Sequence, residues 1–470
     1  MNSFSLRGTW WLPETTDRVV PGVLTFDEDG VTLVIYGTVY QPDIEPNIPE
    51  WRETPVILGR SHDGEKVSVL HAEGANFTHE NTAQSVYKVG LALRGLHVVE
   101  DVFAEAWCGF DCLEAWAGSP RLIDDMAMSG QVAVRIDSST IDQAQIGQAS
   151  VSLTAGVSYD LRPYAIRVDQ EPAFHIKFPE SSLHELLDKW VRPLQDLLTF
   201  SLDRSVRLTT FRLRPTMLSD MDRMVRLLGA GNSFADAFFP AVQARQGRVP
   251  TREEVETFTA PTLLTYHSSG LQFQELISRW FALRAELRDV FVLLTGPYHA
   301  RFIFDEHRYS SAFQSAELLA KKRINAREKT PEAHRARVTA IISALSNAGV
   351  DSEAVDWAQR VLQSRNDKPL RELITELTRS IGAIGEAIFN ASPNFSSIAT
   401  NARTGVSHPG LRRRLGAGGR YWYADALRWI VRARLLVDMG IPLEDAERRV
   451  LDRGSFSQML EEIAKTGTND

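Results

Sequence analysis

The chain has 470 residues, more than a single hydrophobic core usually serves, so two or three domains are expected. Hydrophobic residues make up 43% and charged residues 24%, which is ordinary for a soluble globular protein. No apolar run approaches the roughly 20 residues needed to cross a bilayer, which excludes a membrane-spanning protein. The first residues lack a secretory signal, and the two cysteines, Cys108 and Cys112, are too few for a disulfide framework. We therefore expect a cytoplasmic protein that does not bind membranes.

The net charge of −8 is distributed unevenly along the chain. Residues 1–150 hold 9 Lys and Arg against 22 Asp and Glu, whereas residues 301–470 hold 26 against 21. A strongly acidic first third disfavours binding to nucleic acid, and a basic last third is compatible with it. Random drift of surface charge would explain these numbers equally well if they stood alone.

Residues 1–170 predict short antiparallel strands separated by turns. The strand-like runs include residues 22–26, 31–36, 67–70, 132–136 and 151–153, with turn signals at Asp29-Gly30 and Asp63-Gly64. Strands at this spacing are typical of a sandwich or a barrel. We expect the tryptophans of this region to pack in its core: Trp10, Trp11, Trp51, Trp107 and Trp116.

Residues 171–269 predict a mixed region of helix and strand. Ser182 and Glu185 have the spacing of a capping box, which would open a helix with apolar residues on one face as far as Leu197. Pro193 should bend this helix. Residues 206–213 alternate as a strand does.

Residues 270–470 predict helices almost throughout. Apolar residues recur at helical spacing in four stripes: Leu276–Leu294, Ala312–Lys322, Leu370–Ile388 and Tyr421–Met439. Gly296-Pro297 should end the first stripe, and Gly440 with Pro442 the last. The expected fold is therefore α+β and multidomain: an antiparallel β-rich domain, a mixed region and an all-α four-helix-type bundle.

The stretch Asn401-Ala-Arg-Thr-Gly-Val-Ser-His-Pro-Gly410 carries the chemistry of greatest interest. Arg403 offers a planar, permanent positive charge suited to phosphate. His408 offers the one side chain whose ordinary pKa allows proton transfer near neutral pH. Together they are the minimum equipment for cutting a phosphodiester without a metal. Three further arginines follow at once: Arg412, Arg413 and Arg414.

The geometry of this stretch depends on where its helix ends. Residues 395–403 predict a short helix with Asn394 as its cap. Gly405 is costly in a helix, and Pro409 disfavours helical geometry at the residue before it. Five residues along an unbroken helix would place Arg403 and His408 about 140° apart. We therefore expect a break after Arg403 that lets His408 fold back beside it.

In this setting the chain resembles the HEPN ribonuclease superfamily, in which Arg, a spacer of four to six residues and His lie at the end of a bundle helix. Residues 302–319 and 435–442 resemble the opening and the close of the ApeA branch of that superfamily. Residues 8–14 and 22–30 are similar to the β-rich domain that precedes HEPN in ApeA-type proteins. The resemblance implies three regions: a β-rich sensor or regulatory domain at 1–170, a mixed region at 171–269 and a HEPN nuclease domain at 270–470.

The resemblance also implies an activity, namely RNA cleavage in bacterial defence against phage by abortive infection. Arg403 and His408 would be the catalytic residues, attack would come from the 2′-hydroxyl of RNA, and no cofactor or metal would be needed. Cys108, Cys112 and His97 would supply only part of a zinc site. HEPN domains usually pair, so a homodimer or a higher even oligomer is expected.

Several residues have expected supporting roles. Many HEPN nucleases carry Asn, Asp or His directly after the Arg, where this chain has Thr404. Asn401 is therefore a candidate to compensate. The resemblance places Glu317 on the helix that carries the family's polar second-helix position, where it is a candidate to orient Arg403 or His408, or else an exposed helix charge. The arginines at 412–414 are candidates to bind the RNA backbone, or else form a solvated charge run.

A second interpretation is a non-catalytic HEPN scaffold that dimerises or binds RNA, with a phage-sensing N-terminal domain. Thr404 and the acidic first third favour it. A DNA nuclease is disfavoured because the chain lacks an evident paired-carboxylate metal site. The sequence leaves open the RNA target (transfer RNA or messenger RNA) and the trigger, for which a phage-derived protein is one candidate.

Overall fold

A computed structural model describes residues 3–40, 51–79, 82–117, 123–126, 132–135, 140–162, 165–218, 233–240, 262–300, 302–407 and 415–467. The chain divides into two compact units. The first comprises residues 1–281 and 298–301, and the second comprises residues 282–297 and 302–470. Each unit is described by itself.

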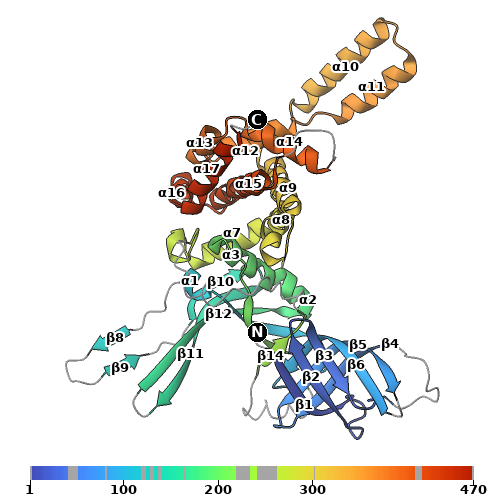
Figure 1. The fold of residues 1–470 in the computed structure, drawn as a ribbon, viewed down its shortest axis with the longest axis vertical. Coiled ribbons are helices and arrows are strands. Elements are labelled where there is room, and N and C mark those ends of the chain that lie inside the picture. Colours follow the sequence, from blue (N-terminus) through green and yellow to red (C-terminus); the bar gives the residue numbers. More distant parts are fainter. Residues whose placement is uncertain are drawn as a thin grey trace. The chain divides into compact units, whose positions relative to one another are not determined.

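The first unit is built on an antiparallel sheet of twelve strands, in the order β10-β11-β12-β7-β13-β14-β6-β3-β2-β1-β4-β5 (Figure 1). Its strands are β1 (Phe4–Trp11), β2 (Val20–Asp27), β3 (Gly30–Ile35), β4 (Trp51–Ser61), β5 (Lys66–His79), β6 (Thr82–Arg94), β7 (Phe103–Phe110), β10 (Thr140–Ile146), β11 (Ala149–Arg162), β12 (Ala165–Ser181), β13 (Leu208–Pro215) and β14 (Ala235–Phe238). A separate pair consists of β8 (Ile123–Met126) and β9 (Val132–Arg135). The strand β12 runs through the domain boundary expected near residue 170.

Strands β1 to β6 close into a barrel, because β5 also pairs with β6. Their inward side chains form one apolar core that includes Leu24, Leu33 and Ile57. Trp10 is buried there at 1% exposure, and its ring lies so close to Gly59 that a Cβ at that glycine would come within 2.3 Å. Closure leaves no free strand edge among these six strands. The expected β-rich fold is confirmed.

The tryptophans of this unit differ in burial. Trp10 and Trp116 are buried in the core, as expected. Trp11 and Trp107 are only half-buried, and each contacts a histidine ring, His97 and His175 respectively. The side chain of Trp51 lies outside the described residues.

The described residues of this unit also form helices: α1 (Leu113–Ala117), α2 (Leu183–Leu186), the π-turn η1 (Leu187–Val191), α3 (Arg192–Leu202), the short η2 (His267–Ser269) and most of α7 (Phe273–Glu286). The predicted cap is confirmed, since the Ser182 hydroxyl accepts a hydrogen bond from the Glu185 N–H. Around Pro193 the helix widens into a π-turn just before the proline, which accommodates the missing N–H and the bulk of the ring. The middle of the chain is therefore mixed, as expected.

The second unit is helical. It contains most of α8 (Arg288–His299), followed by α9 (Asp305–Arg323), α10 (Pro331–Asn347), α11 (Ser352–Ser364), α12 (Leu370–Arg379), α13 (Ala383–Ala391), α14 (Phe395–Ser407), α15 (Ala417–Asp438), α16 (Leu443–Leu451) and α17 (Gly454–Gly467). The helices α9, α12, α14 and α15 pack together, with α9 against α15 as the most extensive contact. None of the helices in the described ranges has the length and hydropathy that a bilayer crossing needs.

Two of the predicted helix boundaries are wrong. The first stripe is split between α7 and α8, and α8 continues through Pro297 to His299, where a proline in the last turn removes only a terminal hydrogen bond. The third stripe is split between α12 and α13 at Gly382, whose φ of 57° no helix can accommodate. The end of α15 is as expected, with Gly440 at a φ of 89°.

Gly382 is predicted to be irreplaceable. A Cβ there would lie 2.1 Å from Oε1 of Glu447, the same oxygen that accepts a hydrogen bond from the Ala383 N–H at 2.7 Å. Gly382→Ala should therefore lower the free energy of unfolding by about 1–3 kcal/mol, measured by chemical denaturation. Gly454→Ala is the control, because that glycine has no positive φ and no atom near its missing Cβ. Equal stability of the two variants would contradict this prediction.

Candidate functional site

The helix α14, which carries Arg403, is anchored at its start. Phe395 is fully buried and stacks on Tyr423 of α15, with ring centroids 5.3 Å apart. One turn later, the Ala399 carbonyl accepts a hydrogen bond of 2.6 Å from the hydroxyl of Tyr309 of α9. Burial raises the pKa of Tyr309, so the hydroxyl remains a donor. Arg403 lies one turn beyond this hydrogen bond, at a position that the bundle core determines.

The break expected after Arg403 is wrong, because α14 continues through Thr404 and Gly405 to Ser407. The Thr404 hydroxyl donates to the Thr400 carbonyl at 3.1 Å, and the Thr400 hydroxyl donates to the Ser396 carbonyl at 2.7 Å. A glycine in a helix costs only about 1 kcal/mol, which a helix anchored by tertiary packing tolerates. The helix therefore ends four residues, or about one turn, after Arg403.

Arg403 is half-buried, and its guanidinium forms no ion pair with a residue in the described ranges. Asn401 lies on the same helix, two residues earlier, and is also half-buried. Two residues correspond to about 200° around a helix, so Asn401 and Arg403 occupy nearly opposite faces. The structure does not bring these two side chains together.

The other predicted residues of this stretch lie outside the described residues: His408, Arg412, Arg413 and Arg414. His408 directly follows Ser407, the last residue of α14. The described chain resumes at Leu415, just before α15.

Glu317 lies elsewhere on α9. It is half-buried and forms an ion pair of 2.7 Å with Lys321. Both side chains line a cavity of about 350 Å³ together with Asp367 and Lys368. Glu317 lies eight residues beyond Tyr309, about 12 Å along the helix axis. Its contacts therefore involve the start of α12, and Arg403 is not among them.

Sequence reasoning missed a polar cluster at the starts of α9 and α15. Arg420 forms an ion pair of 2.6 Å with Glu306 and also donates to the Leu415 carbonyl at 2.8 Å. Arg308 lies over the ring of Tyr421, 5.1 Å from its centroid. This cluster fixes the point at which the chain re-enters the bundle after the Arg403 stretch. Only its arginine content is visible in the sequence, because its partners are more than a hundred residues apart.

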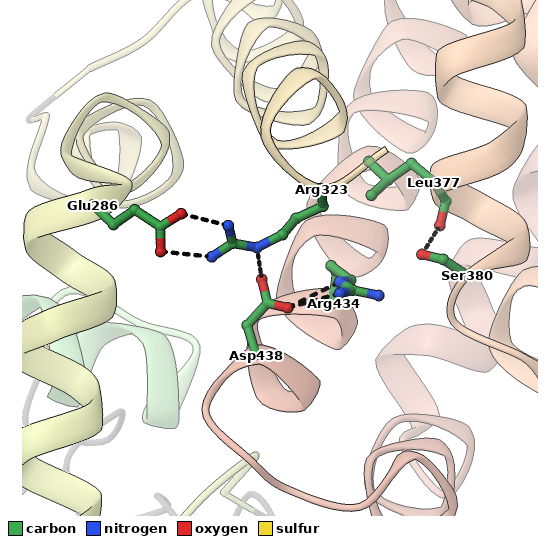
Figure 2. A network of polar contacts seen from close by, with 6 residues as sticks. All are labelled: Glu286, Arg323, Leu377, Ser380, Arg434 and Asp438. Atoms are coloured by element: carbon green, nitrogen blue, oxygen red, sulfur yellow. Dashed lines mark hydrogen bonds and ion pairs between the residues drawn. The ribbon is translucent and has the colours of Figure 1, made fainter. Parts of the chain in front are cut away.

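A second network joins the C-terminal ends of α9 and α15 (Figure 2). The Arg323 guanidinium contacts both oxygens of Glu286, at 2.5 and 3.0 Å, and donates from Nε to Asp438 at 2.6 Å. Arg434 contacts the other oxygen of Asp438 at 2.9 Å. Arg323 holds the pKa of Glu286 below its ordinary value, and the same pair raises the pKa of Arg323. Ion pairs therefore hold α9 and α15 together at both ends.

No group of three His, Cys, Asp or Glu side chains among the described residues is arranged to hold a metal ion. The described part of the chain thus offers Arg403 and the arginines of the polar cluster as cationic groups, and no ligand set for a metal.

Asp438 should contribute more to stability than Glu286. Its carboxylate is only 7% exposed and accepts from two arginines, so Asp438→Asn should lower the free energy of unfolding by about 2 kcal/mol. The Glu286 side chain is 49% exposed, so Glu286→Gln should cost less than about 1 kcal/mol. Denaturant unfolding of both variants tests this order, and the reverse order would contradict it.

The Glu286 pair should be sensitive to acid. Because the pKa of Glu286 is lowered in the folded state, its stabilising contribution is fully present above the unfolded pKa of about 4.3 and is lost as the pH falls through the folded value. The stability difference between the wild type and Glu286→Gln should therefore be present at pH 7 and shrink towards zero in acid. A difference that grows on acidification would refute this assignment.

Comparison with known protein families agrees with this architecture. The family model described as ApeA N-terminal domain 1 matches residues 5–280, which is more than half of the chain. The model described as Apea-like HEPN matches residues 310–445 and so includes α14 and Arg403. No curated protein and no solved structure matches the chain. The chain therefore belongs to the ApeA family, and its helical C-terminal region is the HEPN domain of an ApeA-type protein.

Proposed function

We propose that this ApeA-type protein is an endoribonuclease of anti-phage defence in which Arg403 and His408 cleave RNA without a metal. The Apea-like HEPN match supports a nuclease role in defence at the level of the family. The position of Arg403 carries the assignment to particular residues. This half-buried guanidinium has no ion-pair partner in the described ranges and lies one turn from the end of a helix anchored in the core.

The end of α14 offers a route for His408 to reach Arg403, although not the one expected from sequence. The last residue of α14 is Ser407, four residues or about one helical turn beyond Arg403. His408 is the next residue, and Pro409 disfavours a further helical turn. An imidazole attached there needs to bridge only about one helical turn to share a phosphate with Arg403.

The proposed reaction uses the nucleophile that RNA supplies. His408 removes the proton from the 2′-hydroxyl, and the resulting oxygen attacks the adjacent phosphorus. Arg403 binds the non-bridging oxygens and stabilises the charge that develops on them. The bond to the 5′-oxygen breaks, and that oxygen takes up a proton. The products are a 2′,3′-cyclic phosphate and a 5′-hydroxyl.

The supporting roles are revised in this proposal. Glu317 is engaged with Lys321, and Asn401 lies on another helix face, so neither orients Arg403 directly. The arginines at 412–414 remain candidates to bind the RNA backbone. A second copy of the HEPN domain would supply a second histidine as the acid. The acidic N-terminal region would restrain the nuclease until infection.

The alternative function is a non-catalytic HEPN scaffold that binds RNA or dimerises. One observation favours it. The Thr404 hydroxyl donates its hydrogen bond within α14, so the residue after Arg403 does not offer a polar group like the Asn, Asp or His that many HEPN nucleases carry there. The scaffold therefore predicts RNA binding without cleavage.

Purified protein with labelled RNA and DNA in excess chelator separates these functions. The wild type should cleave RNA only, while Arg403→Ala and His408→Ala should each slow cleavage by about 10² to 10⁴-fold. Arg403→Lys should restore little, because lysine lacks the planar two-donor geometry. The controls are the exposed residues Arg371→Ala and His62→Ala, which should cleave at the wild-type rate. Cleavage that requires a metal, or that survives His408→Ala, would overturn the proposal.

A further inference from the structure

The helices α10 and α11 form a hairpin inserted between α9 and α12, and Figure 1 shows it extending away from the other helices of its unit. Of residues 331–363, only His334 and Val338 are buried. The two helices pack against each other, and neither makes an extensive contact with a helix of the bundle. This part of the HEPN region therefore contributes little to the core of its own chain.

The hairpin is nevertheless a defined element. A short bridge joins Arg327 and Asp367 at its base, with hydrogen bonds from the Glu328 N–H to the Asn366 carbonyl at 2.8 Å and from the Lys368 N–H to the Ala326 carbonyl at 2.7 Å. Thr330 caps the start of α10, and Asp351 caps the start of α11. His334 Nε2 lies 3.0 Å from the Leu362 carbonyl and links the two helices. These contacts fix the hairpin at its base and along its length.

Its apolar side chains are incompletely covered. Trp357 is 61% exposed, Val350 38% and Ile341 37%. Five further aliphatic residues of the hairpin are only half-buried: Ile342, Leu345, Val355, Val361 and Leu362. A tryptophan and several aliphatic side chains thus remain in water on two adjacent helices. Burying such apolar surface would stabilise the protein by about 25 cal/mol per Å². Such a surface is typical of a site that another helical surface covers.

The charges of the hairpin are polarised from tip to base. The tip, residues 347–356, carries three acidic side chains (Asp351, Glu353, Asp356) and no Lys or Arg. The base, residues 327–337 and 360–368, carries seven basic side chains (Arg327, Lys329, Arg335, Arg337, Arg360, Arg365, Lys368) and three acidic ones (Glu328, Glu332, Asp367). Tip and base are separated by the length of α10, about 26 Å. A second hairpin that lies antiparallel to the first would therefore set each tip against a base of opposite charge.

We infer that the α10–α11 hairpins of two copies of this chain pack antiparallel as an intermolecular four-helix bundle. A twofold axis would generate both tip-to-base contacts at once, since each surface then meets its complement. Trp357 and Ile341 would be buried at the centre, where large side chains contribute most to binding. The inference does not depend on cleavage by Arg403 and His408.

Sedimentation velocity of the full-length protein over a range of concentrations tests the contact. Trp357→Asp and Ile341→Asp should each weaken association by about 30-fold or more, so the main species should halve in mass at a fixed concentration. Val19→Asp is the control, because this residue is 49% exposed but lies in the N-terminal unit. Thermal unfolding should be unchanged in all three variants. An unchanged mass for Trp357→Asp would overturn the inference.

A charge exchange tests the antiparallel arrangement. One variant reverses the tip (Glu353→Lys with Asp356→Lys), and the other neutralises the base (Arg335→Glu with Arg360→Glu). Each alone should associate about tenfold more weakly or worse, because the reversed tip is repelled by the basic base, whereas the altered base becomes neutral and no longer attracts the acidic tip. An equimolar mixture should recover wild-type association, since each altered tip then meets an altered base. Failure to recover would refute the packing of two hairpins against each other. RNA binding that is lost while the mass stays unchanged would show that the basic base binds RNA and would also refute a second copy as the partner.

Discussion

The packing of α9 against α15 holds the helical unit together. The two helices run in the same direction, as their ion pairs show: Glu306 with Arg420 near the starts, and Arg323 with Asp438 near the ends. Helices that are parallel and adjacent cannot be joined by a short turn, so the chain between them must travel the length of the bundle and return. The segment from α10 to α14 makes this return, and it includes both the projecting hairpin and the Arg403 helix.

This constraint explains the position of Arg403. The core holds α14 through Tyr309 and Phe395, near the level at which α9 and α15 begin. The helix then extends one turn past Arg403 to Ser407, and Leu415, just before α15, is held by Arg420. A guanidinium on a helix that the core anchors suits the phosphate-binding role proposed for Arg403. The ApeA assignment gives that arrangement its functional context.

The sequence predicted the features that local chemistry determines. The Ser182 cap, the strands β2 and β3, and the glycine after α15 were all visible, because each depends on a few adjacent residues. The two errors at glycines have one physical cause. A glycine costs a helix only about 1 kcal/mol, so tertiary packing decides whether the helix continues, and Gly405 lies within a helix while Gly382 ends one. The hydrogen bond from Tyr309 to a main-chain carbonyl 90 residues away has no sequence signal at all.

The chemistry proposed for Arg403 and His408 would leave a signature on the RNA itself, which sequencing of RNA ends after induced expression can detect. The wild type should generate new fragments that carry 2′,3′-cyclic phosphates upstream of each cut and 5′-hydroxyls downstream, and Arg403→Ala should generate none of them. New ends that carry 5′-phosphates, or the same ends from both proteins, would contradict the proposed role of the pair.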